Sequence, residues 1–220
     1  SARIGGHSTE DNYNININPG AVVTNKGNLI LGWNTPAVLN MNGGTMTVSG
    51  NVYHMDGADG ATVNLNGGAL EAARVFNDSG NGNFLVNFNG GTLRALGDNL
   101  LTEGSDKNNL SSLRVQNGGV MIDSNGKNIE AVQAFAKIGS GGMIKQGSGT
   151  LTFSGGSYTG ATSVTAGTLN VSFNKRAASV TWGAVCDFYR RKTRLVLNGG
   201  NVAVTGRASS ASVAKTFTVG

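Results

Sequence analysis

The octapeptide VNLNGGAL, at residues 63–70, contains the pattern that decides the fold of this chain. Apolar residues alternate with polar ones, an Asn-Gly-Gly step follows, and then the alternation resumes. Alternation with a period of two is typical of a half-buried β-strand, and Asn-Gly or Gly-Gly supplies the positive φ of a tight corner. The octapeptide therefore predicts two short strands joined by a sharp change of direction.

The same pattern returns along the chain at nearly constant intervals. It occupies residues 39–46, 63–70, 86–93, 113–121 and 195–202, and a related Ser-Gly-Gly-Met-Ile stands at 140–144. The first four Asn-Gly-Gly steps begin at positions 42, 66, 89 and 117, so the first two intervals are nearly equal and the third is somewhat longer. One such unit cannot bury its apolar face, whereas stacked units share a continuous core. The repeat predicts an all-β parallel β-helix, a β-solenoid, with coils of about 23 residues.

An antiparallel β-sandwich is the alternative architecture, in which each Asn-Gly step marks a two-residue hairpin. A sandwich does not require a constant repeat length, so the spacing favours the solenoid. The best helical window is residues 128–137, where Ile129, Val132 and Phe135 share one face. That window fits either one short helix or another strand, and we favour the strand.

Composition excludes several classes of protein. Of 220 residues, 35 are Gly, 27 are Asn and 13% are charged, against average usage of about 7% Gly and about 25% charged. Gly has no three-residue period and Pro is scarce, which excludes collagen. Cys186 is the single cysteine, so neither an internal disulfide nor a structural zinc site is expected. No apolar run approaches the roughly 18 residues of a membrane span, and we predict no cofactor.

Stacking explains both the abundant Asn and the scarce charge. Equivalent positions in adjacent coils lie about 4.8 Å apart, where Asn or Thr can form hydrogen-bonded ladders but like charges would repel. The alternation also predicts which side chains point into the core: Leu39, Met41, Met46, Val48, Val63, Leu65, Leu70, Val86, Phe88, Leu93, Leu113, Val115, Met121, Leu151, Phe153, Leu169 and Val171.

One stretch carries a family resemblance. Residues 141–171 read GGMIKQGSGTLTFSGGSYTGATSVTAGTLNV. This stretch resembles the autotransporter-associated β-strand repeat, also called the passenger-associated transport repeat. The matching positions are Gly141, Gly142, Lys145, Gly147, Gly149, Thr150, Leu151, Ser154, Gly155, Tyr158, Thr159, Gly160, Ala166, Gly167, Thr168 and Leu169.

The resemblance implies a right-handed β-helix from a bacterial protein that is secreted or displayed at the cell surface. In that family the repeat is associated with passage and folding of the passenger outside the cell, and not with a catalytic site. We expect a non-catalytic stalk or adhesive display scaffold whose partners are adjoining coils of a longer protein and host or matrix glycans or surface proteins. Neither a secretion signal nor a translocating barrel is present in the sequence, so we expect this chain to be a piece of a longer protein.

The chain divides into four parts on this interpretation. Asn-Gly-Gly repeats fill 1–140, the family repeat fills 141–171, a basic and aromatic interruption fills 172–197, and a further, truncated repeat begins at 198–220. Six cations and Asp187 give residues 175–194 a net charge of +5, which equals the formal charge of the whole chain. The candidate ligand-binding residues for a polyanion or glycan are Trp182, Tyr189, Arg190, Arg191, Lys192 and Arg194. A plain insertion loop is the alternative, and no nucleic-acid recognition motif is present.

Catalytic and metal-binding patterns are sparse. The two histidines, His7 and His54, are far apart in sequence, and we expect both at the surface. Cys186 has no histidine close in sequence to act as its base. Asp56 and Asp59 fit a simple turn better than a calcium loop. Because polysaccharide lyases and glycosidases also use β-helices, a carbohydrate-binding or polysaccharide-degrading protein is the alternative function, with convergence of Asp56, Asp59 and Asp78 as its requirement.

Overall fold

The computed structural model describes residues 1–4, 13–33, 35–55, 60–78, 82–101, 112–153, 156–172, 195–197, 200–208 and 211–219, and side chains up to residue 170. These residues form β-strands and no helix. The strands are β1 (Ala2–Ile4), β2 (Tyr13–Ile17), β3 (Val22–Asn25), β4 (Leu29–Leu31), β5 (Ala37–His54), β6 (Ala61–Asn77), β7 (Phe84–Ala95), β8 (Ser112–Asp123), β9 (Asn128–Ala131), β10 (Phe135–Lys137), β11 (Met143–Gln146), β12 (Thr150–Phe153), β13 (Thr162–Val164), β14 (Thr168–Ser172), β15 (Leu195–Leu197), β16 (Gly200–Ala208) and β17 (Ala211–Val219).

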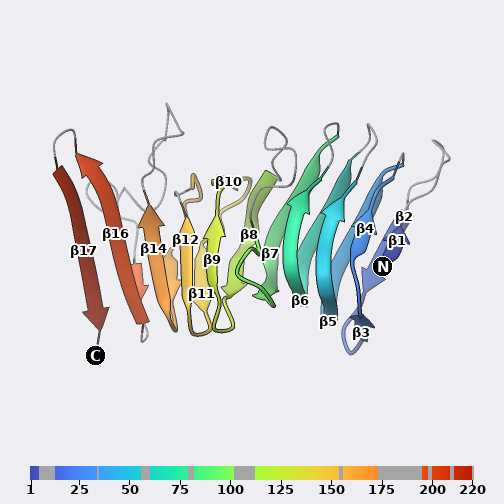
Figure 1. Ribbon diagram of the computed structural model, residues 1–220, viewed down its shortest axis with the longest axis horizontal. Coiled ribbons are helices and arrows are strands. Elements are labelled where there is room, and N and C mark those ends of the chain that lie inside the picture. The colour runs from blue at the N-terminus through green and yellow to red at the C-terminus, as the bar shows by residue number, and fades with distance from the viewer. Residues whose placement is uncertain are drawn as a thin grey trace.

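Parallel pairing between successive coils builds a β-solenoid of about six turns. In Figure 1 the strands follow one another along the long axis, from β1–β4 at one end to β17 at the other. Among the described strands every pairing is parallel except that of β16 with β17. The parallel β-helix prediction is therefore confirmed, and the antiparallel sandwich is wrong. Window 128–137 forms β9 and β10, so the strand interpretation of that window is also confirmed.

Each coil contributes to three faces. Face A contains β2, the first halves of β5 to β8, and β10. Face B contains β3, the middle of β5 and of β6, the ends of β7 and β8, then β11, β13 and β15. Face C contains β1, β4, the ends of β5 and β6, then β9, β12, β14 and β16. The Asn-Gly-Gly steps lie where face A turns into face B, as the corner prediction requires.

Coil length changes along the stack. In the first half Ala37 pairs with Ala61, an interval that matches the spacing of the Asn-Gly-Gly steps. In the second half Met143 pairs with Thr162, which is a shorter interval. The later coils are shorter because face A is reduced there to an isolated bridge at Phe135. We call the earlier coils long and the later coils short.

An apolar core runs through the stack from Ile17 to Leu169, as far as side chains are described. Phe88 contacts Phe135 edge-on with ring centroids 5.8 Å apart, and Phe135 contacts Phe153 in the same way at 5.9 Å. The predicted core residues that are buried are Leu39, Met41, Met46, Val48, Val63, Leu65, Leu70, Val86, Phe88, Leu93, Leu113, Val115, Leu151, Phe153 and Leu169. The side chain of Val171 lies outside the described set.

Met121 was placed wrongly by the sequence pattern. Its side chain is only half-buried, whereas Ile122, the next residue, is fully buried. Phe88 pairs with Val115 and Thr92 with Met121, so β8 has two more residues than β7 across this corner. One of them precedes the Asn-Gly-Gly step and one follows it, so Leu93, two residues after Gly91, pairs with Ile122, three residues after Gly119. The inward position counted from the step is therefore displaced by one residue, from Met121 to Ile122, because successive side chains of a strand point to opposite faces.

Candidate functional site

The predicted ligand-binding residues cannot be placed. Trp182, Tyr189, Arg190, Arg191, Lys192 and Arg194 all lie outside the described residues, as do Cys186, His7, Asp56 and Asp59. Within the described residues, no group of three or more His, Cys, Asp or Glu side chains could hold a metal ion. The described part of the chain also has no helix with the length and apolar character of a membrane span.

His54 is buried, so the expectation of a surface histidine was wrong. It ends β5 and pairs with Leu31 of β4, and its side chain is 1% exposed. Its Nδ1 lies 3.0 Å from the Leu31 carbonyl oxygen, to which it donates in the tautomer that carries the proton on Nδ1. Nε2 has no hydrogen-bond partner among the described residues. Alternate side chains of a strand point to opposite sides, and His54 occupies one of the inward positions on face C, so its imidazole lies inside the stack.

An asparagine ladder follows the outer side of face A. The Nδ2 of Asn40 donates to Oδ1 of Asn16 at 2.9 Å, that of Asn64 to Asn40 at 2.7 Å, and that of Asn87 to Asn64 at 2.7 Å. All four occupy the same register position in successive coils. We call this row the first ladder, and it confirms the predicted stacking of amides.

A second ladder runs parallel to the first, two residues further along each coil. The Nδ2 of Asn42 donates to Oδ1 of Asn18 at 3.3 Å, that of Asn66 to Asn42 at 3.1 Å, and that of Asn89 to Asn66 at 3.4 Å. At the far end the backbone N–H of Gly118 donates to Oδ1 of Asn89 at 2.9 Å. The two ladders place eight amides in two rows on four coils.

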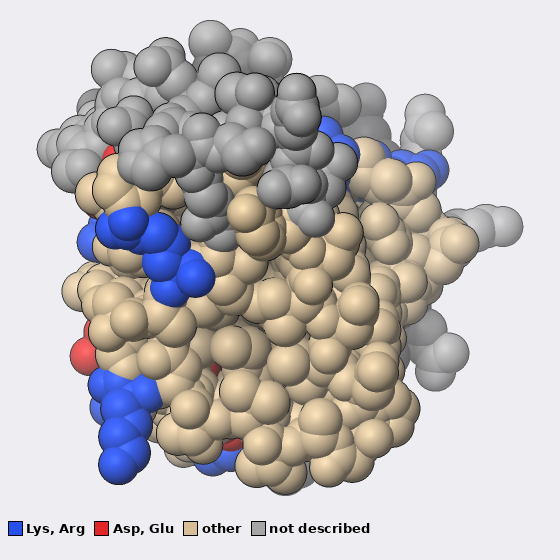
Figure 2. All heavy atoms as spheres, turned by 90° about the vertical axis from the view of Figure 1, so that its right-hand side faces the viewer, with Lys and Arg blue, Asp and Glu red and all other residues tan. Residues whose placement is uncertain are grey.

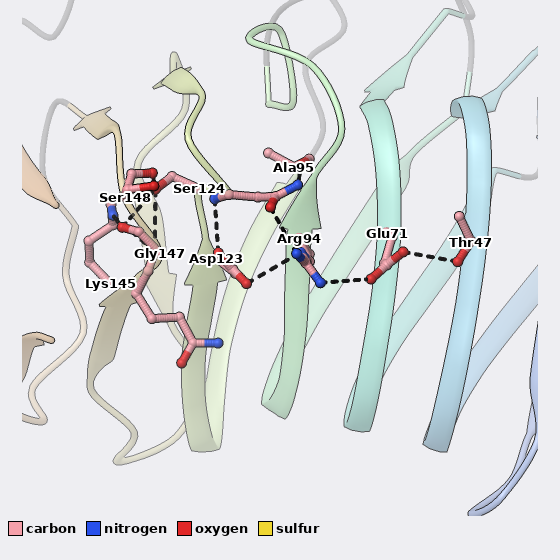
Figure 3. Close-up of polar contacts among 11 residues, drawn as sticks. Thr47, Glu71, Arg94, Ala95, Asp123, Ser124, Lys145, Gly147 and Ser148 are labelled. Atoms are coloured by element: carbon pink, nitrogen blue, oxygen red, sulfur yellow. Dashed lines mark hydrogen bonds and ion pairs between the residues drawn. The ribbon is translucent and has the colours of Figure 1, made fainter. Parts of the chain in front are cut away.

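Face B carries a charged row at a single register position. The Thr47 hydroxyl donates to Oε2 of Glu71 at 2.9 Å, and Nη1 of Arg94 lies 3.3 Å from Oε1 of Glu71. On its other side Nε of Arg94 lies 3.5 Å from Oδ2 of Asp123. Figure 3 shows this row passing from strand to strand, with the guanidinium between the two carboxylates.

The charged row does not have the geometry of a glycosidase. Hydrolysis of a glycoside uses two carboxyl groups that face each other across one substrate. Glu71 and Asp123 instead share Arg94, whose guanidinium occupies the space between them. Asn125 completes the cluster by accepting from Nη2 of Arg94 at 2.8 Å and donating to the Ala95 carbonyl at 2.9 Å. The row therefore ties four coils together.

Lys145 is a buried cation inside the stack. It pairs with Ile122 and Val164, which are both buried, and its own side chain is fully buried. Its ammonium donates to the carbonyls of Gln146, Gly147 and Ala166 at 2.9, 2.7 and 3.1 Å. A lysine has three donors, so each N–H has one acceptor. From inside the stack, the Lys145 side chain thus links the corner at Gln146 and Gly147 to Ala166 of the next coil.

Burial controls the protonation of Lys145. Loss of solvent around the ammonium lowers its pKa from 10.5 to about 8, and the nearby Asp123 carboxylate opposes this decrease. Next to it, the Ser124 hydroxyl lies 2.7 Å from the Ser148 carbonyl (Figure 3). The Lys145 ammonium and the Ser124 hydroxyl add side-chain hydrogen bonds to corner carbonyls, and those of Gln146 and Ser148 also accept from backbone N–H groups of the neighbouring coil.

Tyr158 adds a second polar group to the interior of the short coils. The ring is fully buried, and its hydroxyl lies 2.9 Å from Oγ1 of the buried Thr162. Burial raises the pKa of Tyr158 to about 12, while the Thr162 hydrogen bond opposes that increase. The phenol therefore stays neutral at all physiological pH values.

Lys145, Tyr158 and Thr162 fall in a segment that matches a family model. Residues 143–171 match the family model of the passenger-associated transport repeat. The comparisons with curated proteins and with solved structures found no match. The sequence resemblance is thus confirmed for this segment.

The structure gives a physical reason for three residues of the transport repeat: Lys145, Tyr158 and Gly149. Its lysine satisfies three carbonyls, its tyrosine fills the core, and Gly149 adopts a φ of +95° at a corner. A Cβ at Gly149 would lie 2.3 Å from the Lys127 carbonyl oxygen of the preceding coil. Sequence reasoning missed the role of Lys145, although strict alternation from Met143 would have placed its side chain inside.

Proposed function

We propose that this chain is a segment of the rigid, non-catalytic stalk of a bacterial passenger protein that is secreted or displayed at the cell surface. The observation that carries the proposal is the coincidence of two findings. Residues 143–171 match the passenger-associated transport repeat, and the same residues form short coils within a continuous β-solenoid. The stalk holds attached segments at a distance from the cell and offers its faces for adhesion.

The use of the polar side chains supports a mechanical role. Both asparagine ladders, the charged row and Lys145 connect one coil to the next. In a stack of this kind each repeat contacts only its neighbours, so bonds between neighbours set the resistance to unravelling. A rigid stalk requires this arrangement.

Protease treatment of intact cells that express the natural full-length protein tests the proposal. We expect antibodies against residues 13–170 to label intact cells or the medium, and added protease to remove the cell-associated label. Labelling that appears only after lysis would overturn surface display. The purified protein, incubated with polysaccharides, should release no new reducing ends or unsaturated sugars, and release of either product would overturn the non-catalytic assignment.

A further inference from the structure

The two asparagine ladders differ from the charged row in the hydrogen-bonding capacity that they leave over. Each amide has two N–H donors and an oxygen with two lone pairs. A ladder bond uses one donor and one lone pair, as between Asn64 and Asn40. In the charged row, by contrast, Arg94 meets Glu71, Asp123 and Asn125. Each inner rung of a ladder therefore retains one N–H donor and one lone pair, whereas the guanidinium of Arg94 is held between two carboxylates and an amide oxygen.

Those spare groups face solvent. Asn16, Asn18, Asn42 and Asn66 are exposed, and Asn40, Asn64, Asn87 and Asn89 are half-buried. The four coils repeat the amides about 4.8 Å apart over roughly 14 Å along the axis, and the two rows lie about 6.6 Å apart across each strand. The ladder bonds fix the side chains, so little rotamer freedom remains to be lost when a ligand binds.

The ladder surface carries no charge. Next to the first ladder, face A presents a third outward-facing row of Asn14, Val38, Thr62 and Leu85. All twelve residues of the three rows are neutral, and the first charged residue in register is Arg114, after Asn87. Figure 2 looks along the axis onto the β1–β4 end of the stack, where most of the described surface is neither Lys or Arg nor Asp or Glu. A charged polymer would find no counter-charge on these rows.

We propose that the paired asparagine ladders are a binding surface for a neutral polysaccharide whose chain runs along the solenoid axis. Sugar hydroxyls are both donors and acceptors, so they match amides that offer both at regular spacing. The half-buried Val38 and Leu85 side chains supply apolar contact for sugar ring faces, as ligand sites commonly do. This inference rests on the proposed surface role, because only a displayed stalk meets extracellular polymers.

A charge placed on the first rung tests the proposal without breaking the ladder. Oδ1 of Asn16 and of Asn18 only accepts in the ladder bonds from Asn40 and Asn42. Asn16→Asp/Asn18→Asp therefore keeps both acceptors, removes the spare donors and adds two negative charges. The matched control is Val22→Asp/Thr24→Asp, which adds the same charges at the same spacing to exposed positions of the same coil on face B.

The experiment is affinity electrophoresis of the whole chain in gels that contain cellulose-, mannan-, galactan- or glucan-type neutral polysaccharides, with heparin as the charged comparison. We expect the wild-type chain to be retarded by at least one neutral polymer, the Asn16→Asp/Asn18→Asp variant to bind it at least tenfold more weakly, and the face B control to bind like the wild type. Equal retardation of both variants, or retardation by heparin alone, would overturn the proposal. So would the absence of wild-type retardation in every neutral gel, and since labelling of intact cells is a separate measurement, such a failure leaves the stalk assignment intact.

Discussion

The coils of residues 13–101 and those of residues 143–170 achieve the same stacking in opposite ways. In the first region, the long coils have a mainly apolar interior, although His54 is buried there, and they place two ladders of amides outside. In the second region, the short coils bury a lysine and a tyrosine. Inside the short coils Lys145 donates to three corner carbonyls, and the Tyr158 hydroxyl lies beside that of Thr162.

The difference suggests a relation between coil length and the place where polar side chains form hydrogen bonds between coils. A long coil has a full face A on which side chains can stack at intervals of about 4.8 Å. A short coil has lost that face, since only the bridge of Phe135 with Gly156 remains of it. It makes polar bonds inside, between Lys145 and three carbonyls and between Tyr158 and Thr162, in addition to an amide bond from Asn170 to Thr152 between half-buried positions.

The largest expected effect comes from the aromatic chain that joins the two regions. Phe88 lies in a long coil and packs against Phe135, which packs against Phe153 of a short coil. Phe88→Ala should lower the free energy of unfolding by about 3–5 kcal/mol, because it removes a fully buried ring. Urea denaturation followed by circular dichroism measures the loss. A loss below about 1 kcal/mol would mean that the register of β7 is wrong.

Loss of the buried cation should destabilise the short coils next most strongly. Lys145→Met fills a similar volume but removes three hydrogen bonds to carbonyls, which should cost about 1–3 kcal/mol. The matched control is Lys137→Met, at an exposed position of β10, which should change stability by less than about 0.5 kcal/mol. Equal effects of both substitutions on the urea midpoint would contradict an interior role for Lys145.

The buried Lys145 of the short coils should also make the free energy of unfolding depend on pH. The pKa of Lys145 is about 8 in the folded chain and about 10.5 in the unfolded chain, so between these values the unfolded chain binds more protons. Raising the pH from about 8 to 10.5 should therefore stabilise the wild type relative to Lys145→Met, by at most about 1.4 kcal/mol per pH unit. Paired urea titrations at pH 7.5, 8.5 and 9.5 measure this difference, and a difference that falls with pH would contradict the assignment.

The smallest effects belong to the exposed ladders. Asn64 makes two ladder bonds and Asn16 makes one, so Asn64→Ala should cost about 1–2 kcal/mol and Asn16→Ala about half as much. Thermal unfolding of the two variants compares an inner rung with a terminal one. If the terminal substitution is the more damaging of the two, the ladder is not a source of stability.

Sequence reasoning recovered the features that follow from periodicity. Alternation and the recurring Asn-Gly-Gly step predicted the solenoid, the ladders and the buried residues, since stacking at a constant period leaves few other arrangements. Alternation counted from the Asn-Gly-Gly step failed at Met121, because β8 has one more residue than β7 after that step. Residue type suggested the surface for His54, whereas strand phase places it inside, and the interior position of Lys145 was not predicted.

The charged row on face B could not be predicted from the spacing of carboxylates alone. The interval from Arg94 to Asp123 is longer than that from Glu71 to Arg94, so the three form a row only once the corner of β8 is known to hold extra residues. The basic residues 175–194 stay a prediction, since they lie outside the described residues.

Oxidative cross-linking tests the parallel stacking of coils most directly. In a Cys186→Ser background, Asn40→Cys/Asn64→Cys joins two positions that are paired in register although a whole coil separates them in sequence. The solenoid predicts a disulfide between them, and no disulfide in Asn40→Cys/Thr45→Cys, whose positions lie on faces A and B. An antiparallel hairpin at Asn42-Gly43 would place residues 40 and 45 opposite each other. Cross-linking of the 40/45 pair without the 40/64 pair would contradict the stacked-coil account.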